Sequence, residues 1–246
     1  MSKILIETCC GFAEDVIRSE KGGAQRAELC SNLFQGGLTP SVGTLITAKR
    51  HSSIPINCMI RPREGGFCYT EHEFETAMED AKLLLEHGAD GLVFGFLNED
   101  GTIDKKRCQA ILEIIGDKDN TFHRAIDVVP DWREALDTLI ELGVHRVLTS
   151  GQEPDVYQGM DTVREMIEYA DGRIIIMPGA GITPKNAKKI EDETGCQEMH
   201  IAVYDTAYDY STSHRQDIYF GGMLFPPEER YNLIDPKQVE ALRNNL

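Results

Sequence analysis

Short apolar segments alternate with helical patterns along almost the whole chain, and this regular alternation limits the folds open to it. The apolar segments are rich in β-branched residues, and the helical patterns carry capping residues at their starts and glycines after their ends. We predict strands at 3–9, 26–30, 56–61, 91–97, 120–126, 145–150, 174–178 and 198–203. Eight strand–helix units in 246 residues are typical of a (βα)8 TIM-type barrel, an α/β fold, and we expect a single domain over residues 1–246.

A doubly wound open sheet is the alternative to a barrel, but regular units without a domain break favour closure. One long segment, 204–234, follows the last predicted strand and departs from the pattern. We expect this segment to be irregular and to lie at the C-terminal face of the barrel. A loop of this length is usually a lid, an oligomer contact or a disordered stretch.

Charge and composition argue against several classes of protein. Asp and Glu outnumber Lys and Arg by 41 to 25, so we expect no nucleic-acid partner, because that binding needs clustered basic residues. The sequence has no run of about 18 apolar residues and no signal pattern at its N-terminus, so we expect no membrane partner and a cytoplasmic location. The seven cysteines include no C-x-x-C pair, which favours free thiols over a disulfide framework or a zinc site.

Charged residues on the predicted strands indicate which strand face points into the barrel. A charge that faced the covering helices would lose its hydration, so strand charges should point inward. On the fifth strand the inward face would carry Thr121, His123, Ala125 and Asp127. For the whole barrel the rule predicts an interior set of Glu7, Glu28, Arg61, His123, Glu198 and His200, with Cys9 and Cys30 above it and Arg63 and Arg124 at the rim. One Glu–Arg pair is usually structural, but so many titratable groups at one mouth favour a functional site.

These groups have the chemistry of an enzyme site. The candidate acid–base groups are Glu7, Glu28, His123 and His200. The guanidinium groups of Arg61, Arg63 and Arg124 are candidates for holding an anionic substrate. The sequence therefore supports an enzyme of isomerase or lyase type that acts on a small anionic or phosphorylated metabolite and needs no organic cofactor.

A second candidate anion site follows the seventh strand. Gly179 and Gly181 end this strand, and Thr183 with Pro184 predicts a helix start directly after them. Backbone N–H groups at a helix start suit a phosphate, and Ser150 after the sixth strand would add a donor. A strand-to-helix turn needs glycine even without a ligand, so both interpretations stay open.

Cys9 and Cys30 stand at the ends of the first two strands, which we expect to be neighbours about 4.8 Å apart. Two thiolates at that separation can hold one Cu(I) ion, which prefers soft sulfur ligands. Two other interpretations remain: both residues are small buried side chains, or one thiol is a nucleophile activated by a nearby cation. Cys10 falls on the opposite strand face and is a poor third ligand.

Seven specific segments extend nearly from end to end of the chain: ELCSNLFQGGLTPSVG (28–43), MIRPREGGFCY (59–69), DGLVFG (90–95), TFHRAID (121–127), RVLTSG (146–151), MPGAGIT (177–183) and EMH (198–200). Together they resemble the CutC family of copper homeostasis proteins. The resemblance implies a TIM-type barrel, a cytoplasmic location, copper binding and a homo-oligomer, either a dimer or a tetramer. It also implies that Cys9 and Cys30 are the Cu(I) ligands, whereas Cys10 is not a dependable part of the pattern.

The chain departs from this resemblance at two positions. Ala202 stands where a serine is expected, so a ligand-binding hydroxyl would be missing there. Glu64 stands where glycine is common, so the loop after the third strand is expected to differ. Two functions from different classes follow, a copper-binding protein and an enzyme acting on a small anionic metabolite.

Overall fold

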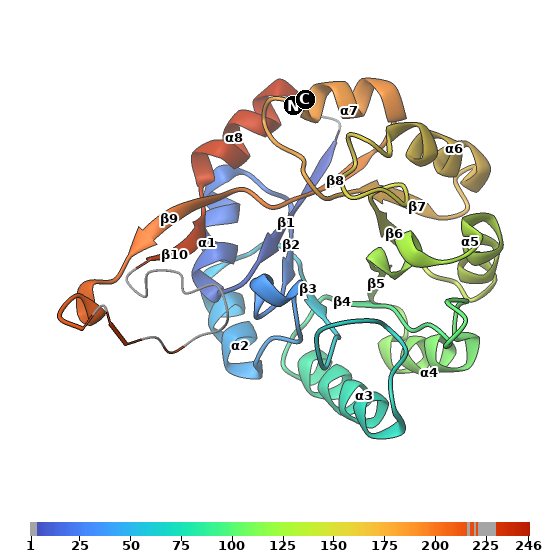
Figure 1. The fold of residues 1–246 in the computed structure, drawn as a ribbon, viewed down its shortest axis with the longest axis horizontal. Coiled ribbons are helices and arrows are strands. Elements are labelled where there is room, and N and C mark those ends of the chain that lie inside the picture. The colour runs from blue at the N-terminus through green and yellow to red at the C-terminus, as the bar shows by residue number, and fades with distance from the viewer. Residues whose placement is uncertain (1–3, 216, 219, 221–229) are drawn as a thin grey trace.

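The computed structural model describes residues 4–215, 217, 218, 220 and 230–246 (Figure 1). Its elements are, in chain order, β1 (Leu5–Cys10), α1 (Ala13–Gly22), β2 (Arg26–Leu29), η1 (Leu33–Gln35), α2 (Val42–His51), β3 (Ile56–Met59), α3 (Glu71–Glu86), β4 (Gly91–Phe94), α4 (Lys105–Ile115), β5 (Asp119–Phe122), η2 (Arg124–Val128), α5 (Trp132–Glu141), β6 (Arg146–Thr149), α6 (Met160–Ala170), β7 (Ile175–Pro178), α7 (Ala187–Thr194), β8 (Glu198–Ile201), β9 (Tyr204–Tyr208), η3 (Tyr210–Thr212), β10 (Arg230–Ile234) and α8 (Pro236–Asn245). All the predicted barrel strands are present as β1 to β8.

Strands β1 to β8 form one sheet in the order β7-β6-β5-β4-β3-β2-β1-β8, and its neighbouring strands run parallel. The two ends of this order, β7 and β8, lie against each other, so the sheet curves into a nearly closed barrel. Figure 1 looks into this barrel and shows the helices arranged around it. The predicted TIM-type barrel is therefore confirmed, and the open doubly wound sheet is wrong.

The main hydrophobic core lies between the strands and the surrounding helices. Outward-facing strand residues form its inner layer, among them Ile6, Leu29, Leu92, Phe122 and Ile201, all fully buried. Side chains alternate in direction along a strand, so the residues between these point into the barrel. Many of the inward-facing residues are polar, among them Glu7, Glu28, Asn57, Thr121 and His200. A small apolar cluster of Cys30, Met59 and Val93 also lies inside, so the barrel interior combines buried polar groups with an apolar wall.

Capping residues fix where several helices begin. Thr70 and Glu73 form the predicted capping box at the start of α3. Asp131 accepts hydrogen bonds at the start of α5, and Asp235 caps α8 directly before Pro236. The longest of these helices, α3, has 16 residues, and among the described residues no helix is both long and apolar enough to cross a membrane.

The predicted helix start at Thr183 and Pro184 is wrong. Helix α7 begins at Ala187, and Asn186 occupies its N-cap position. The backbone N–H of Thr183 donates a hydrogen bond of 2.7 Å to the side-chain oxygen of Asn186. Residues 183–186 therefore form a closed turn, which separates the glycines after β7 from the first turn of the helix.

The predicted alternation on the fifth strand is also wrong after His123. Strand β5 ends at Phe122, and the chain turns directly into the short 3-10 helix η2. Ala125 consequently packs into the main hydrophobic core instead of the barrel interior. Helical geometry replaces the two-residue period there, so a strand rule cannot assign its side chains.

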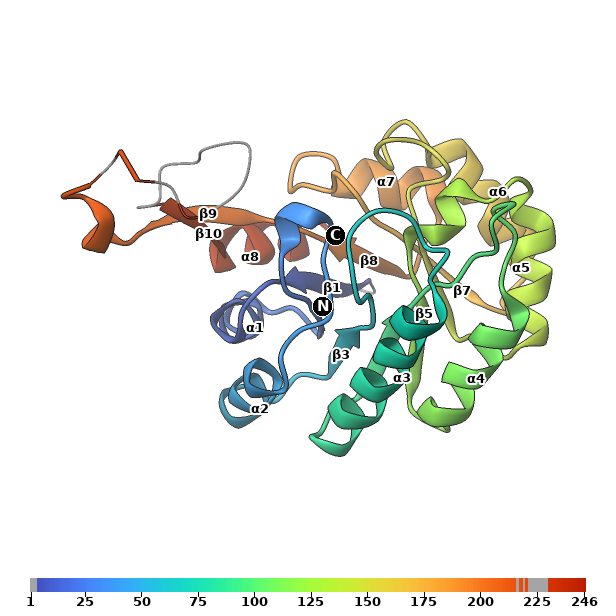
Figure 2. The same ribbon diagram turned by 60° about the horizontal axis from the view of Figure 1, so that its bottom comes forward.

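The segment 204–234 contains regular structure that the sequence did not suggest. Strands β9 and β10 pair antiparallel, with Tyr204 opposite Ile234 and Tyr208 opposite Arg230. Both views show this hairpin extending beside the barrel rather than across it (Figures 1 and 2). Residues 216, 219 and 221–229 of the predicted irregular stretch lie outside the described residues.

Gly91 allows three strands to approach closely inside the barrel. A Cβ at this position would lie 2.4 Å from the carbonyl oxygen of Asp119 and 2.5 Å from Oδ1 of Asn57. We expect Gly91→Ala to lower the free energy of unfolding by about 1–3 kcal/mol, as overpacking of a core does. Urea unfolding measures the difference. Gly43→Ala is the control, since a Cβ there would meet only Oγ of Ser41 at 3.9 Å. An unchanged midpoint for Gly91→Ala would show that the barrel tolerates a wider spacing.

Candidate functional site

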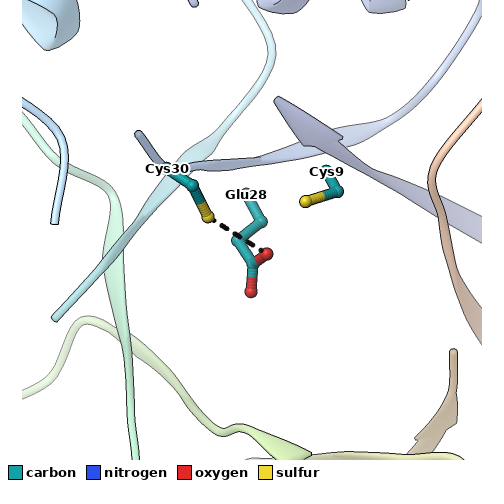
Figure 3. Close-up of side chains that lie close together, drawn as sticks. All are labelled: Cys9, Glu28 and Cys30. Atoms are coloured by element: carbon teal, nitrogen blue, oxygen red, sulfur yellow. Dashed lines mark hydrogen bonds between the residues drawn. The ribbon is translucent and has the colours of Figure 1, made fainter. Parts of the chain in front are cut away.

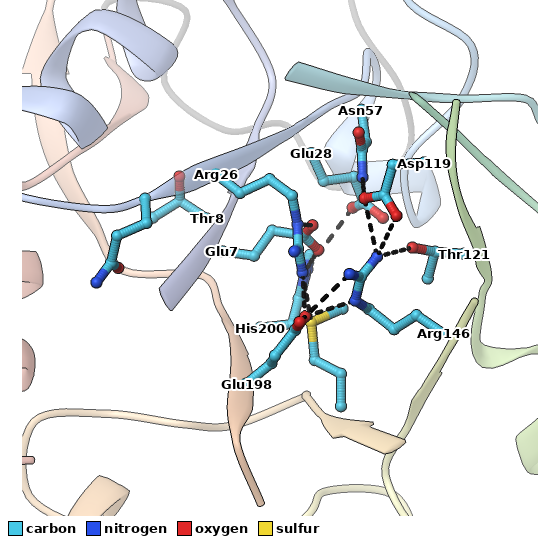
Figure 4. A network of polar contacts seen from close by, with 12 residues as sticks. Glu7, Thr8, Arg26, Glu28, Asn57, Asp119, Thr121, Arg146, Glu198 and His200 are labelled. Atoms are coloured by element: carbon cyan, nitrogen blue, oxygen red, sulfur yellow. Dashed lines mark hydrogen bonds and ion pairs between the residues drawn. The ribbon is translucent and has the colours of Figure 1, made fainter. Parts of the chain in front are cut away.

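Two arginines inside the barrel connect carboxylates from three other strands (Figure 4). Arg26 bonds Glu7 through Nε and Glu198 through Nη2. Arg146 bonds the same Glu198, and its Nη1 lies 3.1 and 3.0 Å from the two oxygens of Asp119. Both guanidinium groups are buried, so water cannot replace a lost partner and each charge depends on the others.

The sequence predicted part of this network. The structure places Glu7 and Glu198 in the interior, as the inward-charge rule requires. Arg146 and Asp119 were not predicted. The same rule would have found Arg146, which is a charged residue on β6 paired in register with inward-facing Thr121. Asp119 was missed because β5 begins one residue before the predicted strand.

Above the arginines, His200 lies between two glutamates. Its Nδ1 is 2.8 Å from Oε1 of Glu7, and its Nε2 is 3.6 Å from Oε2 of Glu28. Burial would raise the pKa of Glu7, but the charge of Arg26 and the bonds to His200 lower it to about 2. Burial lowers the pKa of His200, but the charge of Glu28 and bonds to Cys9 and Glu7 outweigh it and raise the pKa well above its usual value. Glu7 therefore carries a negative charge and His200 a positive one near neutral pH.

The pKa of Glu28 is shifted in the opposite direction to that of Glu7. Burial raises its pKa to about 8, because no arginine pairs with it among the described residues and the attraction of His200 offsets burial only in part. Its Oε1 is buried and makes no hydrogen bond. Glu28 thus keeps its proton to a higher pH than Glu7 does, although both carboxyl groups lie next to His200.

Cys9, Glu28 and Cys30 converge where β1 and β2 end (Figure 3). Their sulfur and carboxylate atoms lie within 4.8 Å of one another, and Cys30 forms a hydrogen bond of 3.4 Å with Oε2 of Glu28. Hydrogen bonding from Cys30 lowers the pKa of Cys9, burial opposes this, and His200 lowers the pKa further through its bond and charge. The same contact with Cys9, together with burial, raises the pKa of Cys30. Cys9 is therefore the more acidic thiol of the pair.

Cys10 lies on the other face of β1, as predicted. It is fully buried in the main hydrophobic core, and its sulfur contacts the hydroxyl groups of Thr8 and Ser19 at 3.5 Å. Burial raises the pKa of the Cys10 thiol, so this side chain stays protonated. The adjacent cysteines of ETCC therefore differ in chemistry because successive strand residues face opposite sides.

His123 follows β5 and is 4% exposed. Its Nδ1 accepts a hydrogen bond of 3.2 Å from the backbone N–H of Ala125, while its Nε2 is buried without a partner. Burial lowers the pKa of His123 to about 3, and the charge of Arg61 contributes to this. The imidazole is therefore neutral at pH 7 and carries its proton on Nε2, because Nδ1 is already an acceptor.

Arg61 connects the loops after β2 and β3. Its Nη1 donates to the carbonyl oxygens of Gln35 and Gly37 at 2.9 and 3.0 Å, and its Nη2 donates to that of Gly65 at 2.9 Å. Its Nε is buried without a hydrogen-bond partner. Within the described part of the chain no carboxylate forms an ion pair with Arg61. Its positive charge thus faces carbonyl dipoles and the Phe67 ring, whose centroid lies 5.5 Å from Cζ.

A cavity of 330 Å³ opens at this mouth. Its polar lining consists of Cys9, Glu28, Arg61, His123, Arg124 and His200, and its apolar lining of Gly36, Met59, Phe67, Leu148, Ala180 and Ala202. All four candidate acid–base groups thus lie at or directly beneath this cavity, since Glu7 contacts His200 from below. Ala202 leaves a methyl group on the wall at the position where a serine was expected.

Four of the predicted substrate-binding residues, Arg63, Ser150, Gly179 and Gly181, do not line this cavity. Arg63 pairs with Glu73 at 2.7 Å on the outer side of its loop. The hydroxyl group and the backbone N–H of Ser150 both donate to Asp127. The donors that were predicted to hold an anion are therefore already used. Gly179 packs against Leu148 and His200, and Gly181 packs against Asp155, so their loop closes on protein side chains. Arg124 does line the cavity, with its Nε paired to Asp127.

The CutC family matches residues 4–204 of the chain. A CutC family protein from Treponema denticola is 53% identical over 246 residues, which covers 100% of both chains. The copper homeostasis protein cutC homolog of Homo sapiens is 41% identical over 238 residues, covering 97% of this chain and 87% of its own.

Comparison with solved structures supports the barrel fold. The crystal structure of the copper homeostasis protein CutC from Streptococcus agalactiae is 35% identical and has a TM-score of 0.77, covering 80% of this chain and 97% of that one. Thiamine phosphate pyrophosphorylase from Pyrococcus furiosus has a TM-score of 0.60 at 13% identity, covering 99% of this chain and 96% of that one. The second likeness concerns the barrel fold alone.

The Cys9 thiolate should react with an alkylating reagent at a pH where ordinary thiols do not. We expect the pH midpoint of Cys9 alkylation by iodoacetamide to lie well below 9, because Cys30 and His200 lower its pKa. Mass spectrometry of the peptide after timed alkylation measures the midpoint. In His200→Gln, which removes the positive charge, the midpoint should rise. Equal midpoints in the two proteins would show that His200 does not stabilise the thiolate.

Proposed function

Because the chain belongs to the CutC family, we propose that it binds Cu(I) through the thiolates of Cys9 and Cys30 at the barrel mouth, as part of copper homeostasis. One observation supports this most directly: the two sulfur atoms come from neighbouring strand ends and lie within 4.8 Å of each other. Relatives named for copper homeostasis that share 41% of residues with this chain support the same function.

The donor set suits Cu(I). Soft sulfur ligands favour Cu(I), and a thiolate is the binding form of cysteine. The surroundings of Cys9 lower its pKa and favour the thiolate, whereas those of Cys30 raise its pKa, so Cys30 must lose its proton when the ion binds. Binding therefore releases a proton, and the apparent affinity for Cu(I) should increase as the pH rises.

His200 and the two glutamates would tune this site without contributing hard oxygen ligands. Two thiolates and one Cu(I) carry a net charge of −1, which the adjacent imidazolium of His200 balances. Glu7 holds His200 in place through the 2.8 Å bond to Nδ1. Glu28 accepts a hydrogen bond of 3.4 Å from Cys30 through Oε2 and so holds the second sulfur in place.

An anaerobic Cu(I) titration against a competing chelator tests this function. We expect wild-type protein to bind one equivalent of Cu(I), and Cys9→Ala/Cys30→Ala to lose this binding because no soft donor pair remains. Each single variant should weaken binding at least about tenfold, since a two-sulfur site would lose half of its ligands.

Cys10→Ala is the matched control. It removes the thiol next to Cys9 in sequence, but that thiol faces the main hydrophobic core. Its Cu(I) stoichiometry and affinity should equal those of wild type. One-equivalent binding that survives in the double variant would place the copper site elsewhere.

A second function, an enzyme of isomerase or lyase type, is supported by the size and lining of the cavity. A single ion needs a few donor atoms, whereas 330 Å³ lies in the range of small-molecule pockets. An activated nucleophile generally contacts an acid–base group that a third side chain orients. Here Cys9 would be the nucleophile, His200 the acid–base group that contacts it, and Glu7 the carboxylate that orients His200. Copper would then inhibit such an enzyme by occupying its thiolate.

We also propose a cytoplasmic location and assembly into a dimer or tetramer. All seven cysteines are free, which fits a reducing compartment. The β9–β10 hairpin extends beside the barrel, and Tyr210 in η3 directly after β9 is 68% exposed, so this region offers a contact surface outside the barrel (Figure 2).

A further inference from the structure

We propose that the cavity above the thiol pair binds a small organic carboxylate with a neighbouring carbonyl oxygen, a 2-oxo acid, which receives hydrogen bonds from His123 and faces the unpaired charge of Arg61. The proposal deepens the second function above, because it names the class of molecule that the cavity takes. It does not depend on copper binding, since neither His123 nor Arg61 belongs to the sulfur site.

His123 supplies a donor with no acceptor. Its imidazole is 4% exposed, lines the cavity and has no partner at Nε2. Because Nδ1 accepts the N–H of Ala125, the proton lies on Nε2, where a ligand oxygen would satisfy it. A buried polar group without a partner destabilises a protein by about 1–3 kcal/mol, so a ligand acceptor at this place has a clear energetic role.

The surrounding residues hold His123 firmly in that position. Its ring packs against Phe67 with centroids 4.8 Å apart. Gly95 makes room for it, since a Cβ on Gly95 would lie 2.3 Å from Cε1 of the imidazole. A larger residue at position 95 would displace the ring. The glycine directly after β4 therefore leaves the space that the imidazole occupies. The imidazole is therefore preorganised for one acceptor position.

Arg61 supplies the charge that selects an anion. Carbonyl groups fix its two terminal nitrogens, and within the described chain no carboxylate pairs with it. A ligand carboxylate in the cavity would provide the missing opposite charge. Arg124 adds a second cation to the wall, but Asp127 already neutralises it through the 2.7 Å ion pair.

The rest of the cavity wall is apolar. Met59, Phe67 and Leu148 suit a short carbon chain. One charged donor, Arg61, and one neutral donor, His123, facing an apolar space match a molecule with one carboxylate and one neutral carbonyl oxygen.

Isothermal titration calorimetry at pH 7 with three matched probes tests the proposal. 2-Oxobutyrate has both groups, butyrate lacks the carbonyl oxygen, and butanamide lacks the charge. We expect wild type to bind 2-oxobutyrate about tenfold more tightly than butyrate, because one hydrogen bond to a buried donor is gained. Butanamide should bind more weakly than butyrate. Equal affinities for all three probes would overturn the proposal.

Variants of His123 locate the carbonyl contact. His123→Leu should bind 2-oxobutyrate and butyrate equally, whereas His123→Gln, which keeps a side-chain N–H donor, should retain part of the preference. A preference unchanged in His123→Leu would overturn the assignment. Cu(I) titration of both variants shows that the mouth is intact, since the sulfur pair is untouched.

A phosphate probe distinguishes this proposal from the enzyme function on which it rests. If glycerol 3-phosphate binds and 2-oxobutyrate does not, the cavity takes a different anion, so the 2-oxo acid assignment fails while the enzyme function stands. If none of the probes binds to wild type that binds Cu(I) normally, both the assignment and the enzyme function fail, and copper binding stands alone.

Discussion

The paired charges of Arg26 and Arg146 inside the barrel are the interaction on which every polar group at the mouth depends. They join Glu7, Asp119 and Glu198 from three other strands in a space from which water is excluded (Figure 4). Breaking a buried pair leaves an uncompensated charge, which typically destabilises a protein by about 3–5 kcal/mol. A shift of one residue in any of these strands would turn its charge toward the helices, so the network also fixes the strand register.

This network extends upward into the chemistry of the mouth. Arg26 keeps Glu7 ionised, and ionised Glu7 binds Nδ1 of His200. The charged His200 in turn favours the thiolate form of Cys9. Glu28 has no arginine partner in the described structure, and burial raises its pKa. Two glutamates on neighbouring strands thus have pKa values shifted in opposite directions because only one of them contacts a guanidinium group.

Much of this arrangement follows from the sequence, because the two-residue period of a strand and the cost of burying a charge together determine which side chains point inward. Glu7, Glu28 and His200 were placed correctly on that basis. The rule fails where the strand ends: β5 gives way to η2 after Phe122, and α7 starts three residues later than its Thr183–Pro184 signal suggests. The antiparallel hairpin of β9 and β10 was also missed, because its pairing joins segments about 25 residues apart and leaves no local pattern.

The two proposed ligands depend on two histidines at the same barrel mouth, one charged and one neutral. The charge of His200 favours the Cys9 thiolate that would bind Cu(I), and neutral His123 would donate a hydrogen bond to the 2-oxo acid. The most direct measurement is ¹⁵N NMR of histidine-labelled protein at pH 7, with the two rings assigned from His123→Gln and His200→Gln. Our account predicts that His200 is protonated on both nitrogens, whereas His123 is neutral with its proton on Nε2. A neutral His200 would remove the charge that favours the Cys9 thiolate, and a charged His123 would remove the basis for its bond to Ala125; either result would contradict the account.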